Sequence, residues 1–193
     1  MHDEFAVKMM KNCEDLADLA HSRVGQYRKG SGRPYIEHPL RVAETVKELM
    51  PLDCRITPEA VSAALLHDTK EDTDITDDEI LAVSTPRVLE LVNELTNPSK
   101  QFVFKQEYKL LPKGSVRAMK KQMDREHLAH VSWEAKVIKL ADRIDNVSDM
   151  VGMDQEFCLL YADESVLLLD ALRGTYQPLE DELEQAIQRL RDR

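Results

Sequence analysis

Apolar residues recur every three or four positions along most of the chain, which is the spacing of a helix with one buried face. The spacing predicts helices over about 3–24, 38–50, 58–68, 115–129 and 155–173, and further helices that start at Thr76, Thr85 and Ser132 and after Pro178. No stretch shows the two-residue alternation of a convincing strand. We therefore expect an all-α fold, arranged as one compact bundle of about eight to ten helices.

Residues with strong positional preferences mark several ends of these helices. Thr57 and Pro58 fit an N-cap followed by proline in the first turn, and Thr76 with Glu79 fits a capping box. Residues 25–34 include three glycines, a serine and a proline, so we expect a loop there. Residues 97–112 have no clear period, which predicts a second, longer loop.

The most apolar helix is followed at once by two residues that can carry charge. Residues 60–66 are Ala, Val, Ser or Leu, which predicts a helix buried on all sides. His67 and Asp68 end this helix, and Asp142 lies in another helix whose other side is apolar. Burying a charge without a partner is costly, so these side chains need a cation or a counter-charge.

A further residue, His38, precedes a proline at a helix start and completes a set of two imidazoles and two carboxylates. Such mixed nitrogen and oxygen ligands suit Mn²⁺, Fe²⁺ or Zn²⁺, and the lack of thiolates argues against a structural zinc. Glu71 and Asp72 follow His67 and Asp68 by four residues each. We therefore expect them beside the metal, where they can orient a water molecule or transfer a proton.

The charge of the chain restricts its partners. The formal net charge is −10, which argues against duplex nucleic acid or an anionic membrane. Basic residues nevertheless gather in 23–33 and 101–125, and acidic ones in 70–79, as expected of a site for a cation and an anion. Neither a signal peptide nor a membrane span is apparent, and the three cysteines form no disulfide or zinc pattern. We therefore expect a cytoplasmic protein with 1–193 as a single domain.

The same residues lie in motifs that resemble the hydrolase domain of the RelA/SpoT family. The resemblance is greatest to its small stand-alone alarmone hydrolases, which include the metazoan SpoT homologue. It covers about 16–150 and rests on 25–29 (GQYRK), 33–43 (RPYIEHPLRVA), 63–73 (AALLHDTKEDT), 94–96 (ELT) and 139–146 (KLADRIDN). It implies an HD-domain helical bundle, which the helices over 155–191 would complete.

The resemblance also implies a reaction, a metal and a set of site residues. The substrate would be guanosine tetra- or pentaphosphate (ppGpp or pppGpp), and water would attack the phosphorus bonded to O3′, releasing pyrophosphate and GDP or GTP. One Mn²⁺ ion would be held by His38, His67, Asp68 and Asp142, and Glu71 and Asp72 would handle the attacking water. Substrate contacts would come from Arg28, Lys29, Ser31 and Asn146. Because 193 residues leave no room for a synthetase domain, we expect hydrolysis only.

Two other functions stay open on the sequence alone. An HD hydrolase for another nucleotide, such as pppApp or NADPH, would use the same metal centre. A sensor that binds metal or nucleotide without turnover would not need Glu71 and Asp72. His127 and His130 could form a second metal site, although a polar helix end is the simpler hypothesis. The physiological metal, the formation of a homo-oligomer and the role of 97–130 are also left open.

Overall fold

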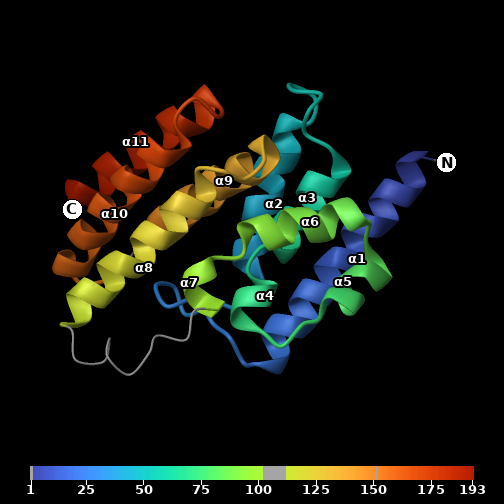
Figure 1. The fold of residues 1–193 in the computed structure, drawn as a ribbon, viewed down its shortest axis with the longest axis horizontal. Helices are drawn as coiled ribbons and strands as arrows, with labels where there is room; N and C mark the ends of the chain where they lie inside the picture. Colours follow the sequence, from blue (N-terminus) through green and yellow to red (C-terminus); the bar gives the residue numbers. More distant parts are fainter. Residues whose placement is uncertain (1, 102–111, 151) are drawn as a thin grey trace.

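The computed structural model describes residues 2–101, 112–150 and 152–193, and every regular element within these ranges is a helix (Figure 1). The all-α prediction is therefore confirmed. The helices are α1 (His2–Arg23), α2 (Glu37–Leu49), α3 (Pro58–Leu66), α4 (Thr69–Asp72), α5 (Asp77–Val83), α6 (Pro86–Leu95), α7 (Pro98–Gln101), α8 (Lys113–Leu128), α9 (Trp133–Ser148), α10 (Gln155–Leu172) and α11 (Gln177–Arg191). These ranges hold eleven helices rather than eight to ten because α4 and α7 are single turns of four residues.

Helix α3 lies at the centre of the N-terminal group of helices. Its residues 60–66 are all buried, as their apolar sequence predicts. Helices α1, α2, α6 and α9 pack around it. Because α3 is surrounded in this way, the chain is still inside the protein when it reaches His67, which is buried.

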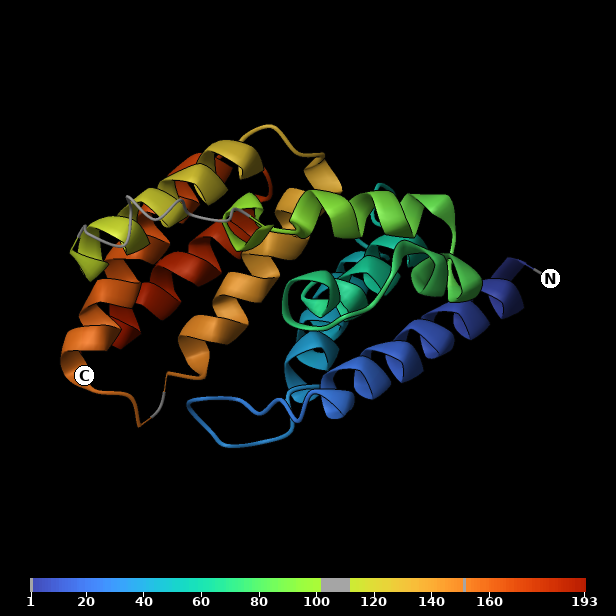
Figure 2. The same cartoon turned by 60° about the horizontal axis from the view of Figure 1, so that its bottom comes forward.

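Helix α9 connects the two parts of the bundle. It packs against α2, α3 and α6 and also against α10 and α11, while α8 lies along α10 (Figures 1 and 2). The loop between α1 and α2 extends beneath the helices in Figure 2, and its Arg28 bonds to Asp149 at the end of α9. Tyr35 of the same loop donates to Asp68 in the turn after α3. Three segments that are far apart in the sequence therefore meet: this loop, the turn after α3, and α9.

The observed helix ends agree with the predicted signals, with one informative exception. Thr76 and Glu79 form both hydrogen bonds of a capping box. The sequence predicts that α3 runs to about Asp68, but the helix ends at Leu66. The Thr69 hydroxyl donates to the Leu66 carbonyl at 2.7 Å, so the chain turns at 67–68 and resumes as α4.

The predicted loop over 97–112 is described only in part. Helix α7 occupies its first residues. The rest, 102–111, lies outside the described residues, together with Lys105 and Lys109 of the predicted basic segment.

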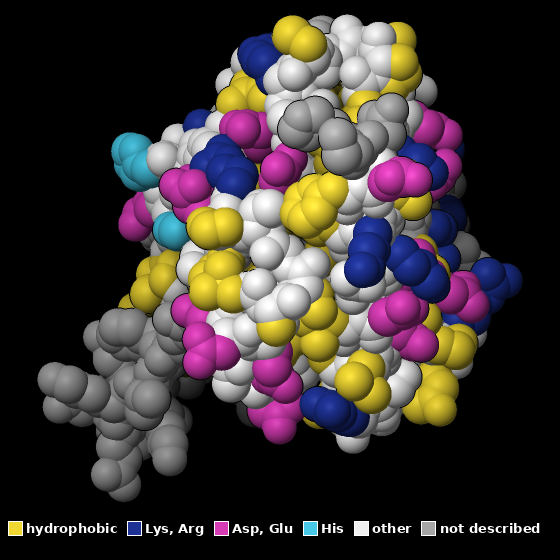
Figure 3. All heavy atoms as spheres, turned by 90° about the vertical axis from the view of Figure 1, so that its right-hand side faces the viewer, with side chains coloured by type: hydrophobic (Ala, Val, Ile, Leu, Met, Phe, Trp, Pro, Cys, Tyr) yellow, Lys and Arg dark blue, Asp and Glu magenta, His cyan; other side chains and the backbone are white. Residues whose placement is uncertain are grey.

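The surface carries charge of both signs. On the face shown in Figure 3, acidic and basic side chains are interspersed with apolar ones. Among the helices described, none is long and apolar enough to cross a membrane.

Candidate functional site

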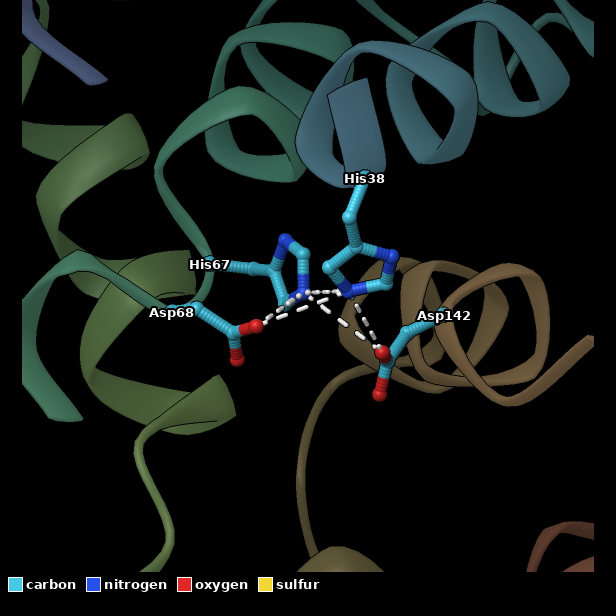
Figure 4. Close-up of side chains that lie close together, drawn as sticks. All are labelled: His38, His67, Asp68 and Asp142. Carbon is cyan, nitrogen blue, oxygen red and sulfur yellow. Dashed lines mark hydrogen bonds and ion pairs between the residues drawn. The ribbon is translucent and has the colours of Figure 1, made fainter. Parts of the chain in front are cut away.

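Four side chains from three separate segments meet at one point (Figure 4). His38 comes from the first turn of α2, His67 and Asp68 from the turn after α3, and Asp142 from α9. Each offers one ligand atom, and these atoms all lie within 4.8 Å of one another. We call this group the His–Asp cluster, and it unites the four residues predicted as metal ligands.

The spacing within the His–Asp cluster suits a divalent cation. His38 Nε2 lies 3.2 Å from His67 Nε2 and 3.1 Å from Asp142 Oδ1, and His67 Nε2 lies 3.1 Å from Asp68 Oδ2. Ligand atoms about 2.1 Å from one ion are separated by roughly 3 Å when they are neighbours in its coordination sphere. The four side chains therefore need little movement to hold an ion.

Hydrogen bonds at the far nitrogen fix the direction of both imidazoles. His67 Nδ1 donates to the carbonyl oxygen of Ala64 at 2.8 Å, and His38 Nδ1 donates to Asp145 Oδ2 at 2.6 Å. With Nδ1 carrying the hydrogen, Nε2 of each neutral ring presents its lone pair to the cluster. The two rings are thereby prepared as metal ligands.

The two aspartates are held in a similar way. Asp142 accepts from the Lys139 ammonium group at 2.7 Å and from the Asn146 amide at 2.5 Å. Asp68 accepts from the Tyr35 hydroxyl at 2.5 Å. Carboxylates that are already oriented reorganise little when they bind an ion, which favours affinity.

The His–Asp cluster favours positive charge. Burial lowers the pKa of His38, but hydrogen bonds to three aspartates outweigh burial and raise it to about 9. The pKa of His67 is also raised, because the charges and hydrogen bonds of Asp68 and Asp142 outweigh the effect of burial. Burial opposes ionisation of Asp68 and Asp142, yet the nearby positive charges hold both pKa values well below their usual range. Because a divalent cation competes with protons for these ligands, its binding releases protons and weakens in acid.

Glu71 and Asp72 lie in α4, one turn after His67 and Asp68. Burial, with a further contribution from the Asp68 charge, raises the pKa of Glu71 to about 7. Glu71 Oε1 accepts from the backbone amide of Asn97 at 2.6 Å, and Asp72 accepts from the side chain of Gln26 at 2.8 Å. A fixed carboxylate that titrates near neutral pH can act as a general acid or base.

A cavity of about 410 Å³ adjoins these residues, and Asp72 and Lys100 form part of its wall. This volume falls within the roughly 300–1,000 Å³ of small-molecule sites. Phe157 and Tyr161 contribute rings with centroids 6.1 Å apart, and the Arg117 guanidinium lies 5.4 Å from the Phe157 ring. Aromatic rings next to cationic groups suit a nucleotide, whose base stacks and whose phosphates are anionic.

Three of the four predicted substrate contacts line this cavity. Arg28, Lys29 and Asn146 belong to its wall, whereas Ser31 is exposed and lies outside it because the chain turns at 29–31. Arg28 is buried and donates to Asn146 at 2.9 Å and to Asp149 at 2.8 Å. Two of the predicted contacts, Arg28 and Asn146, are thus joined by a hydrogen bond.

Sequence reasoning missed residues that hold the loop against α9. Asp145 and Asp149 follow Asp142 by three and seven residues, which puts them near it on one face of the helix. Both pair with Arg28, at 3.3 and 2.8 Å. The helical spacing of the three aspartates is a sequence signal that identifies them. Gly30 is equally necessary, because a Cβ at that position would lie 2.0 Å from the Asp149 carbonyl oxygen.

The second metal site considered from the sequence is not supported. His127 Nε2 donates to the Glu94 carbonyl oxygen at 2.8 Å, so this ring is used in the fold. Within the described part of the chain, His127 and His130 belong to no group of side chains that could hold an ion. The His21 ring is also used in the fold, since its Nδ1 lies 2.7 Å from Gln26 Oε1.

The helical fold and the His–Asp cluster are together typical of one class of proteins. Its members are helical domains that bind a divalent metal ion through histidine and aspartate. A family model described as HD domain matches residues 15–174.

Individual relatives agree with this class. The chain is 32% identical over 188 residues to the Danio rerio protein named guanosine-3′,5′-bis(diphosphate) 3′-pyrophosphohydrolase MESH1, covering 90% of this chain and 94% of the relative. It is 35% identical over 179 residues to the Mus musculus protein of the same name, covering 89% and 90%. GTP pyrophosphokinase rsh of Brucella ovis is 31% identical over 170 residues, which are 86% of this chain but 21% of that protein.

A solved structure is similar over nearly all of the fold. It is described as a metazoan ortholog of SpoT that hydrolyzes ppGpp and plays a role in starvation responses, and it superposes with a TM-score of 0.72. The two chains are 30% identical, and the match covers 94% of each. The chain therefore belongs to the HD-domain family and, within it, to the group that contains the MESH1 proteins. The family resemblance of the sequence motifs is confirmed.

Proposed function

We propose that this protein hydrolyses the 3′-pyrophosphate of guanosine tetra- or pentaphosphate, with one Mn²⁺ ion per chain, to give pyrophosphate and GDP or GTP. The observation that carries the proposal is the His–Asp cluster beside a cavity with aromatic and basic walls. The MESH1 relatives, which the chain matches over most of their length, bear the name of this activity.

The proposed metal ligands are His38, His67, Asp68 and Asp142. Two imidazole nitrogens and two carboxylate oxygens suit Mn²⁺, and a six-coordinate ion keeps positions for water and a substrate oxygen. A bound ion would polarise the phosphoryl group and make water more acidic. The protein contributes fixed ligand directions, since both Nδ1 atoms and both carboxylates are held by hydrogen bonds.

Glu71 is the proposed base for the attacking water. Its pKa of about 7 leaves a substantial fraction ionised at neutral pH. The Asn97 amide holds one oxygen, and the Lys100 ammonium lies 3.6 Å from the other. As the water oxygen bonds to phosphorus, its proton passes to Glu71 while the bond from phosphorus to O3′ breaks. Glu71 can then return the proton to O3′.

Asp72 is the proposed partner that orients the water. Its two oxygens are fixed from different segments, because Gln26 donates to one at 2.8 Å and Lys100 donates to the other at 2.7 Å. The Lys100 ammonium thereby joins Asp72 to Glu71. These contacts support a shared role for the two carboxylates.

The cavity wall supports a nucleoside with several phosphates. Phe157 and Tyr161 offer faces for the guanine base, and the proposed polar contacts come from Arg28, Lys29 and Asn146. Lys100 and Arg117 add positive charge at the same wall. The exposed Ser31 has no role in this arrangement.

A nucleotide panel tests the proposal. Metal-stripped protein with Mn²⁺ added back would be assayed for pyrophosphate release from ppGpp and pppGpp, with pppApp and NADPH for comparison. We expect Mn²⁺-dependent release from the guanosine compounds, abolished in His67→Ala. Turnover of pppApp or NADPH alone would keep the metal chemistry and reject the guanosine assignment. Tight nucleotide binding without turnover would indicate a sensor instead.

A further inference from the structure

A second, smaller cavity lies between α8, α9 and α10 and has a volume of about 40 Å³. Two of its wall residues also contact the functional site. The Lys139 ammonium lies 2.7 Å from Asp142 Oδ2, and the backbone amide of Asn97 donates to Glu71 at 2.6 Å. The cavity thus adjoins the His–Asp cluster, yet it is separate from the 410 Å³ nucleotide cavity, with which it shares no lining residue.

The wall of the small cavity carries an excess of positive charge. It contains four basic side chains, Lys121, Arg125, Lys139 and Arg143. Its two acidic residues have other partners. Asp124 accepts from the backbone amide and hydroxyl of Ser99, at 3.1 and 2.9 Å, and Glu164 pairs with Arg117 at 2.5 and 2.8 Å. The basic groups are therefore neutralised only in part.

Arg143 has donors that the described residues do not satisfy. Its side chain is 7% exposed, and Nε and Nη1 are buried without a hydrogen-bond partner in the described part of the protein. Its Cζ lies 4.6 Å from the centroid of the Tyr161 ring, a cation–π contact that uses none of the N–H donors. Buried donors without an acceptor are costly, so these two groups can take an acceptor from a molecule that enters the cavity.

Lys121 is half-buried and lines the same cavity, where its charged neighbours are Arg143 and Lys139 on one side of the balance and Glu164 and Asp124 on the other. Burial, and then the charges of Arg143 and Lys139, lower its pKa to about 8. An anion between these cations would offset their mutual repulsion. The volume exceeds the roughly 10–15 Å³ that one water needs, so a few waters or one small anion can enter.

We propose that this cavity binds a single tetrahedral oxyanion through Lys121 and Arg143, as free inorganic phosphate or as the terminal phosphate of a nucleotide. Phosphate oxygens would accept from the unpaired guanidinium edge and from the Lys121 ammonium. The inference goes beyond the proposed hydrolysis, because it concerns binding at a site that holds none of the proposed metal ligands or water-handling carboxylates.

Calorimetric titration of inorganic phosphate into the metal-stripped full chain tests the proposal. Lys121→Gln should weaken the binding by at least about tenfold, since a charge-assisted hydrogen bond is removed. Lys8→Gln, which removes one exposed charge from α1, should leave the Kd within about twofold of wild type, and Lys121→Arg should retain binding. A Kd that is the same in Lys121→Gln and Lys8→Gln, for both phosphate and GDP, would overturn the proposal.

Two further arms identify the ligand and its position. Sensitivity to Lys121→Gln with phosphate assigns the site to free oxyanions, and sensitivity with GDP alone assigns it to a nucleotide's terminal phosphate. Crystals of the wild-type protein soaked in selenate should give an anomalous peak between Lys121 and Arg143. A peak confined to other parts of the molecule would contradict the proposal. None of these measurements requires turnover, so their failure is distinct from failure of the proposed hydrolysis.

Discussion

The His–Asp cluster and the nucleotide cavity are neighbours, but the protein builds them in different ways. The cluster is carried by α2, α9 and the turn after α3, which are elements packed around the core, and three of its four residues are buried. The cavity is lined largely by the loop after α1 and by the ends of helices. Core packing thus fixes the elements that carry the metal ligands, whereas a few hydrogen bonds between loop and helix fix the cavity. We therefore expect abrupt loss of chemistry from changes in the first and graded loss of affinity from changes in the second.

The largest effect is expected from Asp68→Asn. The substitution removes one anionic ligand, so the cluster binds a cation more weakly. Because a bound ion stabilises the transition state by several kcal/mol, we expect kcat/KM to fall by about 1,000-fold. The measurement is ppGpp turnover at fixed Mn²⁺, with metal content determined in parallel. Full metal content with unchanged turnover would show that Asp68 is not a ligand.

The next effect is expected from Glu71→Gln, which keeps the shape of the side chain and removes its ability to accept a proton. General acid–base catalysis contributes at least about 10²-fold, so kcat should fall by about that factor while the metal stays bound. Because Glu71 must be ionised to act as a base, wild-type kcat/KM should rise with pH up to about 7, its pKa here. That rise should disappear in the variant. An identical pH profile in both proteins would exclude the role.

A smaller effect is expected on the stability of the protein, from the protonation of His38 in the His–Asp cluster. The pKa of His38 is raised from 6.5 to about 9, so its stabilising contribution is complete below pH 6.5 and is lost as pH rises through 9. The free energy of unfolding of metal-stripped protein should therefore decrease over this range, by at most about 3 kcal/mol. Chemical denaturation at several pH values measures it, with His38→Gln as the comparison. A decrease of equal size in His38→Gln would assign it to other groups.

The smallest effect is expected in the cavity wall, from Phe157→Ala. Stacking of a base on an aromatic ring contributes about 1–3 kcal/mol, so KM for ppGpp should rise roughly 5- to 100-fold with kcat nearly unchanged. Phe157→Tyr should preserve KM, and so should Ser31→Ala, since Ser31 lies on the same loop as Arg28 but outside the wall. Steady-state kinetics separates the cases, and a fall in kcat alone would argue against a binding role.

The contrast between the two regions also explains what the sequence could predict. His67, Asp68 and Asp142 interrupt apolar helical patterns, and a charge inside such a pattern needs a partner, which makes it visible without a structure. Arg28, Lys29, Ser31 and Asn146 became candidates only through the family resemblance, and of these Ser31 alone is exposed and outside the cavity wall. Gln26 and Tyr35 support Asp72 and Asp68 from a loop without periodicity, so no hydrophobic pattern marks them. The small cavity depends on side chains from three helices, and their approach follows from tertiary packing alone.

The most direct test of the central claim is the stoichiometry of metal reactivation. Metal-stripped wild-type protein and Asp142→Asn would be titrated with Mn²⁺ while pyrophosphate release from ppGpp is followed. The account predicts that wild-type activity rises and saturates at one Mn²⁺ per chain, and that Asp142→Asn requires far more metal and stays nearly inactive. Full activity of the metal-stripped protein without added metal, or equal reactivation of both proteins, would contradict it.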